Sequence, residues 1–211
     1  MRTNGEGVPV FALDIDGTLG NYHKHFLWFA AMWLDKEMPG YNTINPGMPL
    51  YKFMGVTRAR YREVKLAYRQ GGLKRFMPAY DGASDLTQAI RKAKCEVWIC
   101  TTRPYLRLDN IDPDTREWLR RNKIRYDAVL FGEDKYKELR RQAGSRVAAV
   151  FDDLPEQCEL AARQRFTTYI RDQPYNRHYV PTIPVMGRVH SCWEIRELIT
   201  KNLDVWRGGL R

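Results

Sequence analysis

Residues 10–20 read VFALDIDGTLG, an apolar run that passes directly into a polar turn. Four apolar residues lead into two aspartates one residue apart, Asp14 and Asp16, which Gly17 and Thr18 follow at once. Because strand residues alternate sides, we expect both carboxylates to leave the carboxyl end of a buried strand together, at the edge where open α/β sheets place their active sites. Carboxylates this close repel unless a cation or a shared proton relieves them, so the stretch predicts a site for a hard ion such as Mg²⁺. An ordinary strand that ends in an Asp-Gly turn is the plainer alternative.

The composition is that of a folded domain rather than a disordered or membrane-spanning chain. The 211 residues suffice for one core with an inserted subdomain, and the hydrophobic content of 44% argues against disorder. No apolar run approaches the roughly 20 residues of a membrane span, and residues 1–10 lack the apolar stretch of a signal peptide. The four cysteines show no metal-binding spacing. We therefore expect no membrane contact and a reduced, cytoplasmic location.

The net charge of +10 is concentrated in one segment. Residues 19–78 hold ten Lys and Arg against three Asp and Glu, a net of +7. A basic segment beside an acidic metal site suits an anionic substrate, through electrostatic steering. A solvated basic face and direct nucleic-acid binding are the alternatives, and charge alone does not separate the three.

The same segment has a helical pattern. Residues 22–38 predict an aromatic-rich helix, and residues 57–70 predict a second one with Thr57 as its N-cap. Cations of the second helix are spaced to share one face: Arg58, Arg62, Lys65 and Arg69. Residues 20–78 therefore read as a small helical cap inserted after the first strand.

Downstream of the cap, apolar strand patterns alternate with helical ones. Further strands are expected at 96–100, 128–131, 146–151 and 167–170, and helices at 81–94, 112–123, 135–142, 154–165 and 191–202. In the 112–123 helix, Asp112 is the expected N-cap and Pro113 the first residue. The pattern predicts an α/β fold, a Rossmann-like parallel sheet with helices on both faces. Residues 1–19 and 79–211 would form this core and 20–78 the cap.

Polar residues follow the ends of several expected strands. They are Thr101 and Thr102, then Lys135, then Asp152 with Asp153. Carboxylates, a hydroxyl and an ammonium at one sheet edge form a coherent phosphate site, with one carboxylate left to attack phosphorus and another to protonate the leaving oxygen. A helix N-cap is the alternative for the last aspartate pair. The alternative for Lys135 is a solvated surface lysine, in which case Lys137 would be the lysine of the site.

The order of these motifs, over about residues 8–177, resembles the haloacid dehalogenase (HAD) superfamily of phosphotransferases. The resemblance implies that Asp14 is a nucleophile that forms an aspartyl-phosphate, and that Asp16 is the general acid and then the general base. It implies that Thr101 and Lys135 bind phosphate. It also implies that Mg²⁺ is held by Asp14, Asp152, Asp153 and the Asp16 carbonyl. An aspartate at position 16 favours phosphomonoesterases over the dehalogenases and ATPases of the superfamily.

A narrower resemblance is to the 5′(3′)-deoxyribonucleotidases, in which a Cys-Thr-Ser-Pro run follows the strand. Here the run is Cys100-Thr101-Thr102-Arg103-Pro104, so Thr102 replaces the serine and Arg103 is an insertion. Both join the expected phosphate ligands, although Arg103 has pairing with a loop carboxylate as its alternative. In that family, cap aromatics cover the nucleobase. The resemblance makes Tyr22, Phe26 and Phe53 the candidates for this role, with packing inside the cap as the alternative.

These resemblances imply a Mg²⁺-dependent phosphatase that hydrolyses (deoxy)nucleoside monophosphates. Its expected partner is a small phosphorylated substrate, and a homodimer is left open. Thr102-Arg103 with residues 114–119 is also similar to the 3′-phosphatase domain of phage polynucleotide kinases, which implies action on nucleic-acid ends. A basic nucleic-acid-binding module without turnover is the non-enzymatic alternative.

Overall fold

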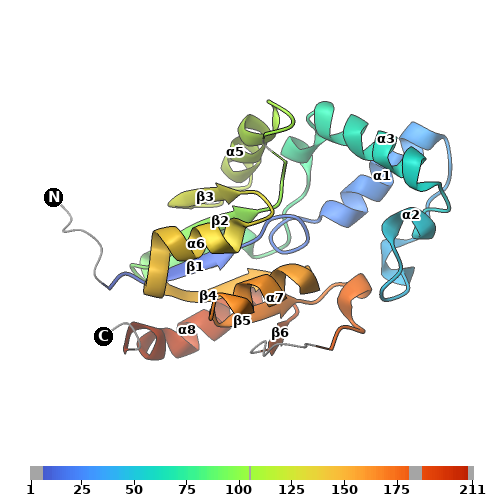
Figure 1. The fold of residues 1–211 in the computed structure, drawn as a ribbon. Helices are drawn as coiled ribbons and strands as arrows, with labels where there is room; N and C mark the ends of the chain where they lie inside the picture. Colours follow the sequence, from blue (N-terminus) through green and yellow to red (C-terminus); the bar gives the residue numbers. More distant parts are fainter. Residues whose placement is uncertain (1–6, 105, 181–186, 209–211) are drawn as a thin grey trace.

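A computed structural model describes residues 7–104, 106–180 and 187–208, and it contains one six-stranded parallel sheet (Figure 1). The strand order is β3-β2-β1-β4-β5-β6, so β1 lies in the middle between β2 and β4. The strands are β1 (Val10–Leu13), β2 (Glu96–Thr101), β3 (Ala128–Phe131), β4 (Val147–Asp152), β5 (Thr168–Arg171) and β6 (Gly187–Val189). This arrangement confirms the predicted Rossmann-like parallel sheet.

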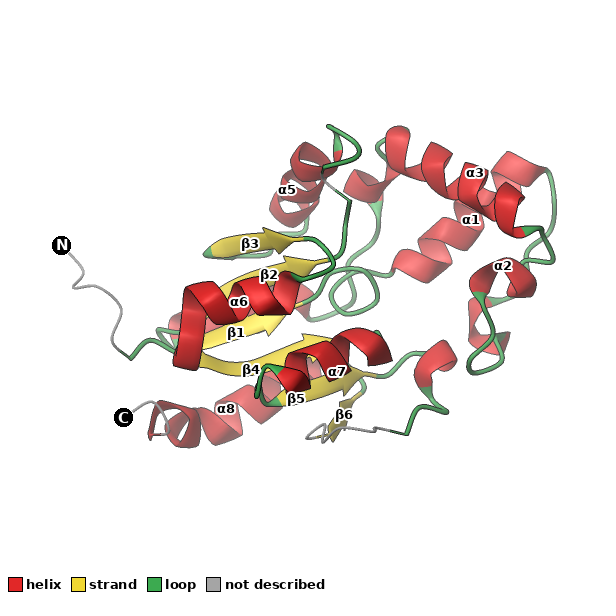
Figure 2. Cartoon of the chain, viewed as in Figure 1, coloured by secondary structure: helices red, strands yellow, loops and turns green. Residues whose placement is uncertain are grey.

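Helices cover both faces of the sheet (Figure 2). Val10 and Ala12 of β1 are buried with residues of α6 and α7 on one face. Phe11 and Leu13 alternate with them and are buried on the other face, with residues of α4, α5 and α8. These helices are α4 (Ala83–Lys92), α5 (Ile111–Arg121), α6 (Lys135–Ala143), α7 (Pro155–Arg163) and α8 (Cys192–Gly208), and two 3₁₀ turns are η3 (Gly144–Arg146) and η4 (Pro174–Asn176).

Residues 20–78, which we call the insert, lie beyond the carboxyl ends of the central strands (Figure 1). The insert contains α1 (Tyr22–Leu34), η1 (Tyr41–Thr43), α2 (Leu50–Phe53), α3 (Arg58–Gln70) and η2 (Leu73–Phe76). It has its own apolar packing, in which the side chains of Phe26, Val64 and Tyr68 are completely buried. The rings of Phe26 and Tyr68 meet edge to face with their centres 5.4 Å apart, which joins α1 to α3.

Several element boundaries differ from the sequence predictions. The expected helix 22–38 ends early at Leu34, because Asp35 takes a left-handed backbone conformation that closes the last turn. Helix α5 begins at Ile111 after Asn110, so Asp112 is not its N-cap. The predicted N-cap Thr57 is confirmed, since its hydroxyl accepts a hydrogen bond from the Arg60 amide at 3.1 Å. The short edge strand β6 was not predicted.

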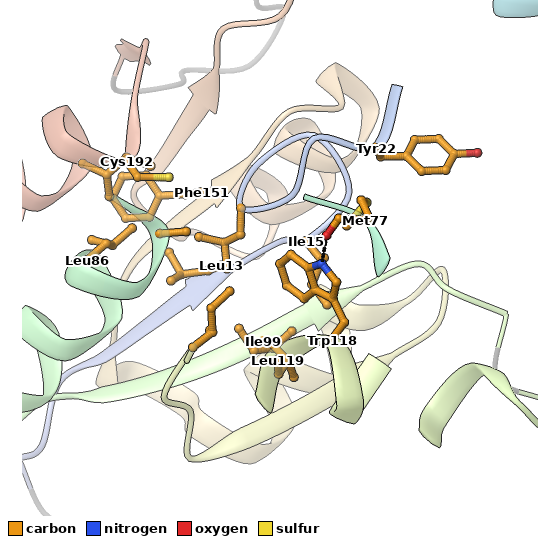
Figure 3. Close-up of a cluster of buried hydrophobic side chains, with 14 of the residues drawn as sticks. Leu13, Ile15, Tyr22, Met77, Leu86, Ile99, Trp118, Leu119, Phe151 and Cys192 are labelled. Carbon is orange, nitrogen blue, oxygen red and sulfur yellow. Dashed lines mark hydrogen bonds between the residues drawn. The ribbon is translucent and has the colours of Figure 1, made fainter. Parts of the chain in front are cut away.

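A buried apolar cluster fixes the point at which the chain leaves the insert (Figure 3). The Trp118 indole of α5 donates a hydrogen bond to the Met77 carbonyl at 2.6 Å. The Met77 side chain also packs over Gly20, where a Cβ atom would lie 2.2 Å from the Met77 Cε. Both ends of the insert are therefore held close together against the core. In the parts of the chain that the structure describes, none of the helices combines the length and the apolar character required to cross a membrane.

Candidate active site

The carboxyl ends of β1 and β4 bring two aspartates together around one buried lysine. Lys135 lies at the start of α6, and its ammonium donates to Asp14 Oδ1 at 2.7 Å and to Asp152 Oδ2 at 2.6 Å. A third hydrogen bond, 3.1 Å long, goes to the Cys100 carbonyl of β2. Lys135 is only 1% exposed. Burial acts against its charge, but the two carboxylates raise the pKa of Lys135 and keep the ammonium protonated.

Asp153 completes a group of three buried carboxylates. Oxygen atoms of Asp14, Asp152 and Asp153 all lie within 4.8 Å of one another. Burial raises the pKa of Asp14 to about 7, although Lys135 acts in the opposite direction, and burial also raises the pKa of Asp153. One ammonium therefore does not neutralise the group. An all-oxygen donor set with excess negative charge fits a hard divalent cation such as Mg²⁺.

Neutral donors and one glycine set the orientation of Asp153. The Thr18 hydroxyl donates to its Oδ1 at 3.2 Å, and the Tyr175 hydroxyl donates to its Oδ2. Gly17 has a φ of +107°. A Cβ atom at this position would lie 2.2 Å from Asp153 Oδ2. The glycine of the sequence motif is thus required twice, by the backbone conformation and by the close approach of the carboxylate.

The Asp16 carboxylate lies outside this group and faces two cations. Arg103 donates to it through Nη2 at 2.6 Å and through Nε at 3.3 Å, and Lys74 of η2 forms a second ion pair. Burial alone would raise the pKa of Asp16, but Arg103 and Lys74 hold it well below its usual range. Burial lowers the pKa of Lys74 to about 7, with Asp16 opposing this effect. A hydrogen bond of 3.1 Å to the Thr115 hydroxyl of α5 fixes the Arg103 guanidinium.

The other expected phosphate ligands occupy the end of β2. Thr101 is buried, and its hydroxyl accepts a hydrogen bond from the Arg103 amide at 3.4 Å. Thr102 follows it and is half-buried. Arg103 pairs with a carboxylate, as the alternative to phosphate binding predicted, and this carboxylate belongs to Asp16. Lys137 is exposed and pairs with Asp134 at 2.8 Å, so the structure leaves Lys135 as the lysine of the site.

The three aromatic candidates differ in their surroundings. Phe26 has no exposed surface and packs between Tyr22 and the aromatic rings of α3, so in this structure it supports the insert and faces no open space. Phe53 is half-buried against the same apolar cluster. Tyr22 is 7% exposed, and the Lys74 ammonium lies 4.5 Å from its ring centre. Tyr22 is therefore the candidate that adjoins the Asp16 ion pairs.

Three contacting residues were not singled out from the sequence. Lys74 was one of many cations in the basic segment, and no spacing rule marked it. Tyr175 lies in the η4 turn after β5, and Tyr136 follows Lys135 and donates to Asp152 Oδ2 at 2.5 Å. Tyrosines at these positions belong to no motif, so only the fold reveals their contacts with the two aspartates.

A cavity of about 460 Å³ lies between the insert and the core, and none of the aspartates of the site lines it. The insert contributes His23, Ile44 and Leu50 to its lining, and the core contributes Leu154 and Tyr175. Its volume lies in the range of small-molecule sites. Tyr175 connects the cavity to the carboxylate group, because its hydroxyl donates to Asp153.

The fold of this chain matches solved structures, although its sequence matches no family model. No family model and no curated protein matches the sequence. Solved structures do match. They include a HAD family hydrolase from Deinococcus radiodurans R1 with bound phosphate and sodium, at a TM-score of 0.66 and 13% identity over 97% of this chain and 98% of that one. CbbY from Rhodobacter sphaeroides in complex with phosphate matches at a TM-score of 0.59 and 16% identity, over 89% and 96% of the two chains.

A putative β-phosphoglucomutase from Thermotoga maritima is a third match, at a TM-score of 0.58 and 14% identity over 92% of this chain and 99% of that one. The matches therefore span nearly the whole of both chains, the insert included. Identities this low establish the fold alone. The chain has the α/β fold of the HAD-superfamily hydrolases.

Proposed function

We propose that this protein is a Mg²⁺-dependent phosphomonoesterase that hydrolyses nucleoside monophosphates through an aspartyl-phosphate on Asp14. The observation that carries the proposal is that the two aspartates after β1 have different surroundings. Asp14 belongs to the group with Lys135, Asp152 and Asp153, whereas Asp16 faces cations on the side of the insert. Two of the structural relatives were solved with phosphate bound, which supports the same class of reaction.

In the first step, a carboxylate oxygen of Asp14 attacks phosphorus, and the bond from phosphorus to the leaving oxygen breaks. Asp16 gives its proton to that oxygen, so a neutral alcohol departs. The Lys135 ammonium and the Thr101 hydroxyl are the groups that would bind phosphoryl oxygens. A divalent cation, held by Asp14, Asp152 and Asp153, would neutralise the charge of the phosphoryl group.

In the second step, Asp16 accepts a proton from a water molecule that attacks phosphorus, and this releases phosphate and restores the Asp14 carboxylate. Asp16 is ionised while Arg103 and Lys74 pair with it, so it is ready for this second role. The first role requires a protonated Asp16. An anionic substrate that draws Arg103 and Lys74 toward itself would raise the pKa of Asp16 and allow the protonation.

The nucleotide part of the proposal rests on the deoxyribonucleotidase-like run of residues 100–104 and on the cavity that Tyr175 lines. Action on a phosphorylated nucleic-acid end is the second candidate. It is favoured by the net charge of +7 in residues 19–78, most of which lie beyond the carboxyl ends of the central strands (Figure 1).

Phosphate release in the presence of Mg²⁺ tests the proposal, with wild type compared against Asp14→Asn. The panel holds nucleoside 5′- and 3′-monophosphates, sugar phosphates and a 3′-phosphorylated oligonucleotide. We expect release from nucleoside monophosphates that Asp14→Asn abolishes, in protein whose mass excludes deamidation back to aspartate. Preference for the oligonucleotide would favour the second candidate, and absence of release from every substrate would refute the phosphatase.

A further inference from the structure

Four cations lie on the side of the insert that faces the Asp16 carboxylate. Lys74 and Arg103 form ion pairs with it. Lys65 and Arg69 lie one helical turn apart on α3, and Lys65 is near enough to Asp16, and Arg69 to Lys74, to act on them electrostatically. Burial lowers the pKa of Lys65 to about 8, with Arg69 adding to the fall and the carboxylates of Asp16 and Glu133 opposing it. Arg69 also adds to the lowering of the Lys74 pKa, after burial and Arg103, so Arg69 acts on both lysines.

The positive charge of this group exceeds what Asp16 can neutralise. Among the residues that the structure describes, no ion pair joins Lys65 or Arg69 to a carboxylate. Lys74 and Arg103 alone already hold Asp16 with three contacts. The two cations of α3 are therefore not explained by the need to balance this carboxylate.

Two buried polar atoms in the same place have no partner. The Nε of Arg69 is buried and makes no hydrogen bond, and neither does the hydroxyl of Tyr22. An unsatisfied buried donor typically costs about 1–3 kcal/mol. Figure 3 shows the Tyr22 side chain pointing away from the apolar cluster around Leu13 and Trp118. Its ring contacts Lys74 and, edge to face, Tyr68, the residue before Arg69. The Lys65 ammonium lies 5.4 Å from the centre of the Tyr61 ring, but among the described residues neither Lys65 nor Arg69 has a carboxylate partner. Buried donors without a hydrogen bond, next to such cations, suit an anionic ligand.

The place of the group identifies which part of a substrate it would meet. Under the proposed function, Asp16 protonates the leaving oxygen, so the leaving group lies against Asp16. The transferred phosphoryl group instead lies at Asp14, whose own cation is Lys135. We propose that Lys65, Arg69 and the Tyr22 hydroxyl form a second anion subsite, and that the preferred substrate carries a second phosphate or phosphodiester on its leaving group. This inference rests on the proposed function for the identity of the leaving group, but the anion subsite itself does not.

Two kinds of nucleotide could supply the second anion. A nucleoside 3′,5′-bisphosphate carries a second phosphate on the same sugar, and the terminal nucleotide of a strand carries a phosphodiester there. Both would place an anion beside the oxygen that leaves. A nucleoside monophosphate lacks it and would leave the cations of α3 unpaired.

The test compares kcat/KM for thymidine 5′- and 3′-monophosphates, thymidine 3′,5′-bisphosphate, and thymidine dinucleotides phosphorylated at one end, with Mg²⁺ and at one ionic strength. The variants are Arg69→Gln, Lys65→Gln and Tyr22→Phe. Arg62→Gln is the matched control, because Arg62 is exposed on the same helix and its loss changes the net charge equally. We expect the wild type to prefer a substrate with a second phosphate or phosphodiester by about 10- to 100-fold. This is the effect of one or two hydrogen bonds to a charged group.

Arg69→Gln should reduce this preference by about tenfold, and Arg62→Gln should retain it. Preference for the bisphosphate alone would identify a second monoester, and preference for the dinucleotide as well would identify a phosphodiester. Equal kcat/KM for substrates with one and with two anionic groups would overturn the subsite. Equal losses of the preference in Arg69→Gln and Arg62→Gln would also overturn it.

Binding separates this inference from the proposed function. Calorimetric titration of Asp14→Asn with thymidine 3′,5′-bisphosphate and with each monophosphate measures the subsite without turnover. If no substrate were hydrolysed, the phosphatase proposal would fail. Tighter binding of the bisphosphate that depends on Arg69 would then still support the subsite, and equal binding of all three ligands would refute it.

Discussion

Replacement of Lys135 by methionine perturbs the candidate site at its most buried charge. The side chain is 1% exposed, and its ammonium lies 2.7 Å from Asp14 and 2.6 Å from Asp152. Methionine keeps the apolar stem but removes the charge. The variant would leave three carboxylates together in the interior with no ammonium in contact.

Loss of one partner from a buried ion pair costs about 3–5 kcal/mol of unfolding free energy. In a chain of this size, that corresponds to a fall in Tm of about 6–20 °C. The penalty should grow with pH. Without Lys135 the pKa of Asp14 rises above its present value of about 7, so the folded variant holds protons that the unfolded chain releases above its ordinary pKa near 3.8. Its stability is therefore retained at low pH and lost as the pH rises through the folded-state pKa.

The assay is urea denaturation of both proteins at pH 5 and pH 8, in EDTA and in Mg²⁺. We expect the loss to be largest at pH 8 in EDTA and to be partly reversed by Mg²⁺, which would replace the missing charge. Lys137→Met is the control, because Lys137 lies on the same helix in an exposed ion pair worth about 0–1 kcal/mol. A loss below about 1 kcal/mol in EDTA at pH 8, or a Mg²⁺ effect no larger than in wild type, would show that Lys135 does not balance the buried carboxylates.

Three further predictions concern the same edge of the sheet. Gly17→Ala should weaken Mg²⁺ binding about 10- to 100-fold in calorimetry, because the new Cβ displaces the Asp153 carboxylate; unchanged affinity would contradict the assigned clash. In wild type, Mg²⁺ affinity should rise with pH by up to about tenfold per unit between pH 5 and 7, because protons on Asp14, whose pKa is raised to about 7, and on Asp153, whose pKa is also raised, compete with the cation. A pH-independent affinity between pH 5 and 7 would argue against this competition. Phe26→Ala should cost about 3–5 kcal/mol in denaturant unfolding, since the ring is completely buried, and a loss under 1 kcal/mol would show that the insert packs differently.

The sheet and its polar edge could be predicted because they follow from short-range rules. Apolar strand patterns alternating with helices predict parallel strands, and parallel strands bring their carboxyl ends to one edge. Asp14, Thr101 and Asp152 each follow or end such a strand, so their meeting was predictable before any contact was known. Lys135 follows from the same logic, because the helix after β3 begins at that edge.

Contacts made by the insert could not be predicted in this way. Lys74 pairs with a residue 58 positions earlier in the chain, and this depends on how the η2 turn returns to the core beneath α3. No local pattern distinguishes Lys74 from the other cations of the basic segment. The packing of Phe26 depends in the same way on the crossing of α1 and α3, which its own sequence neighbourhood does not specify.

Direct detection of the covalent intermediate tests whether Asp14 is the nucleophile. Wild-type protein turning over the preferred phosphomonoester with Mg²⁺ would be quenched and treated with borohydride, which reduces an acyl phosphate and converts that aspartate to homoserine. Peptide mass spectrometry then locates the modified residue. We expect homoserine at position 14, and we expect its formation to require both substrate and Mg²⁺. Homoserine at another aspartate, or full turnover with no modified aspartate in the rapidly quenched protein, would contradict this assignment.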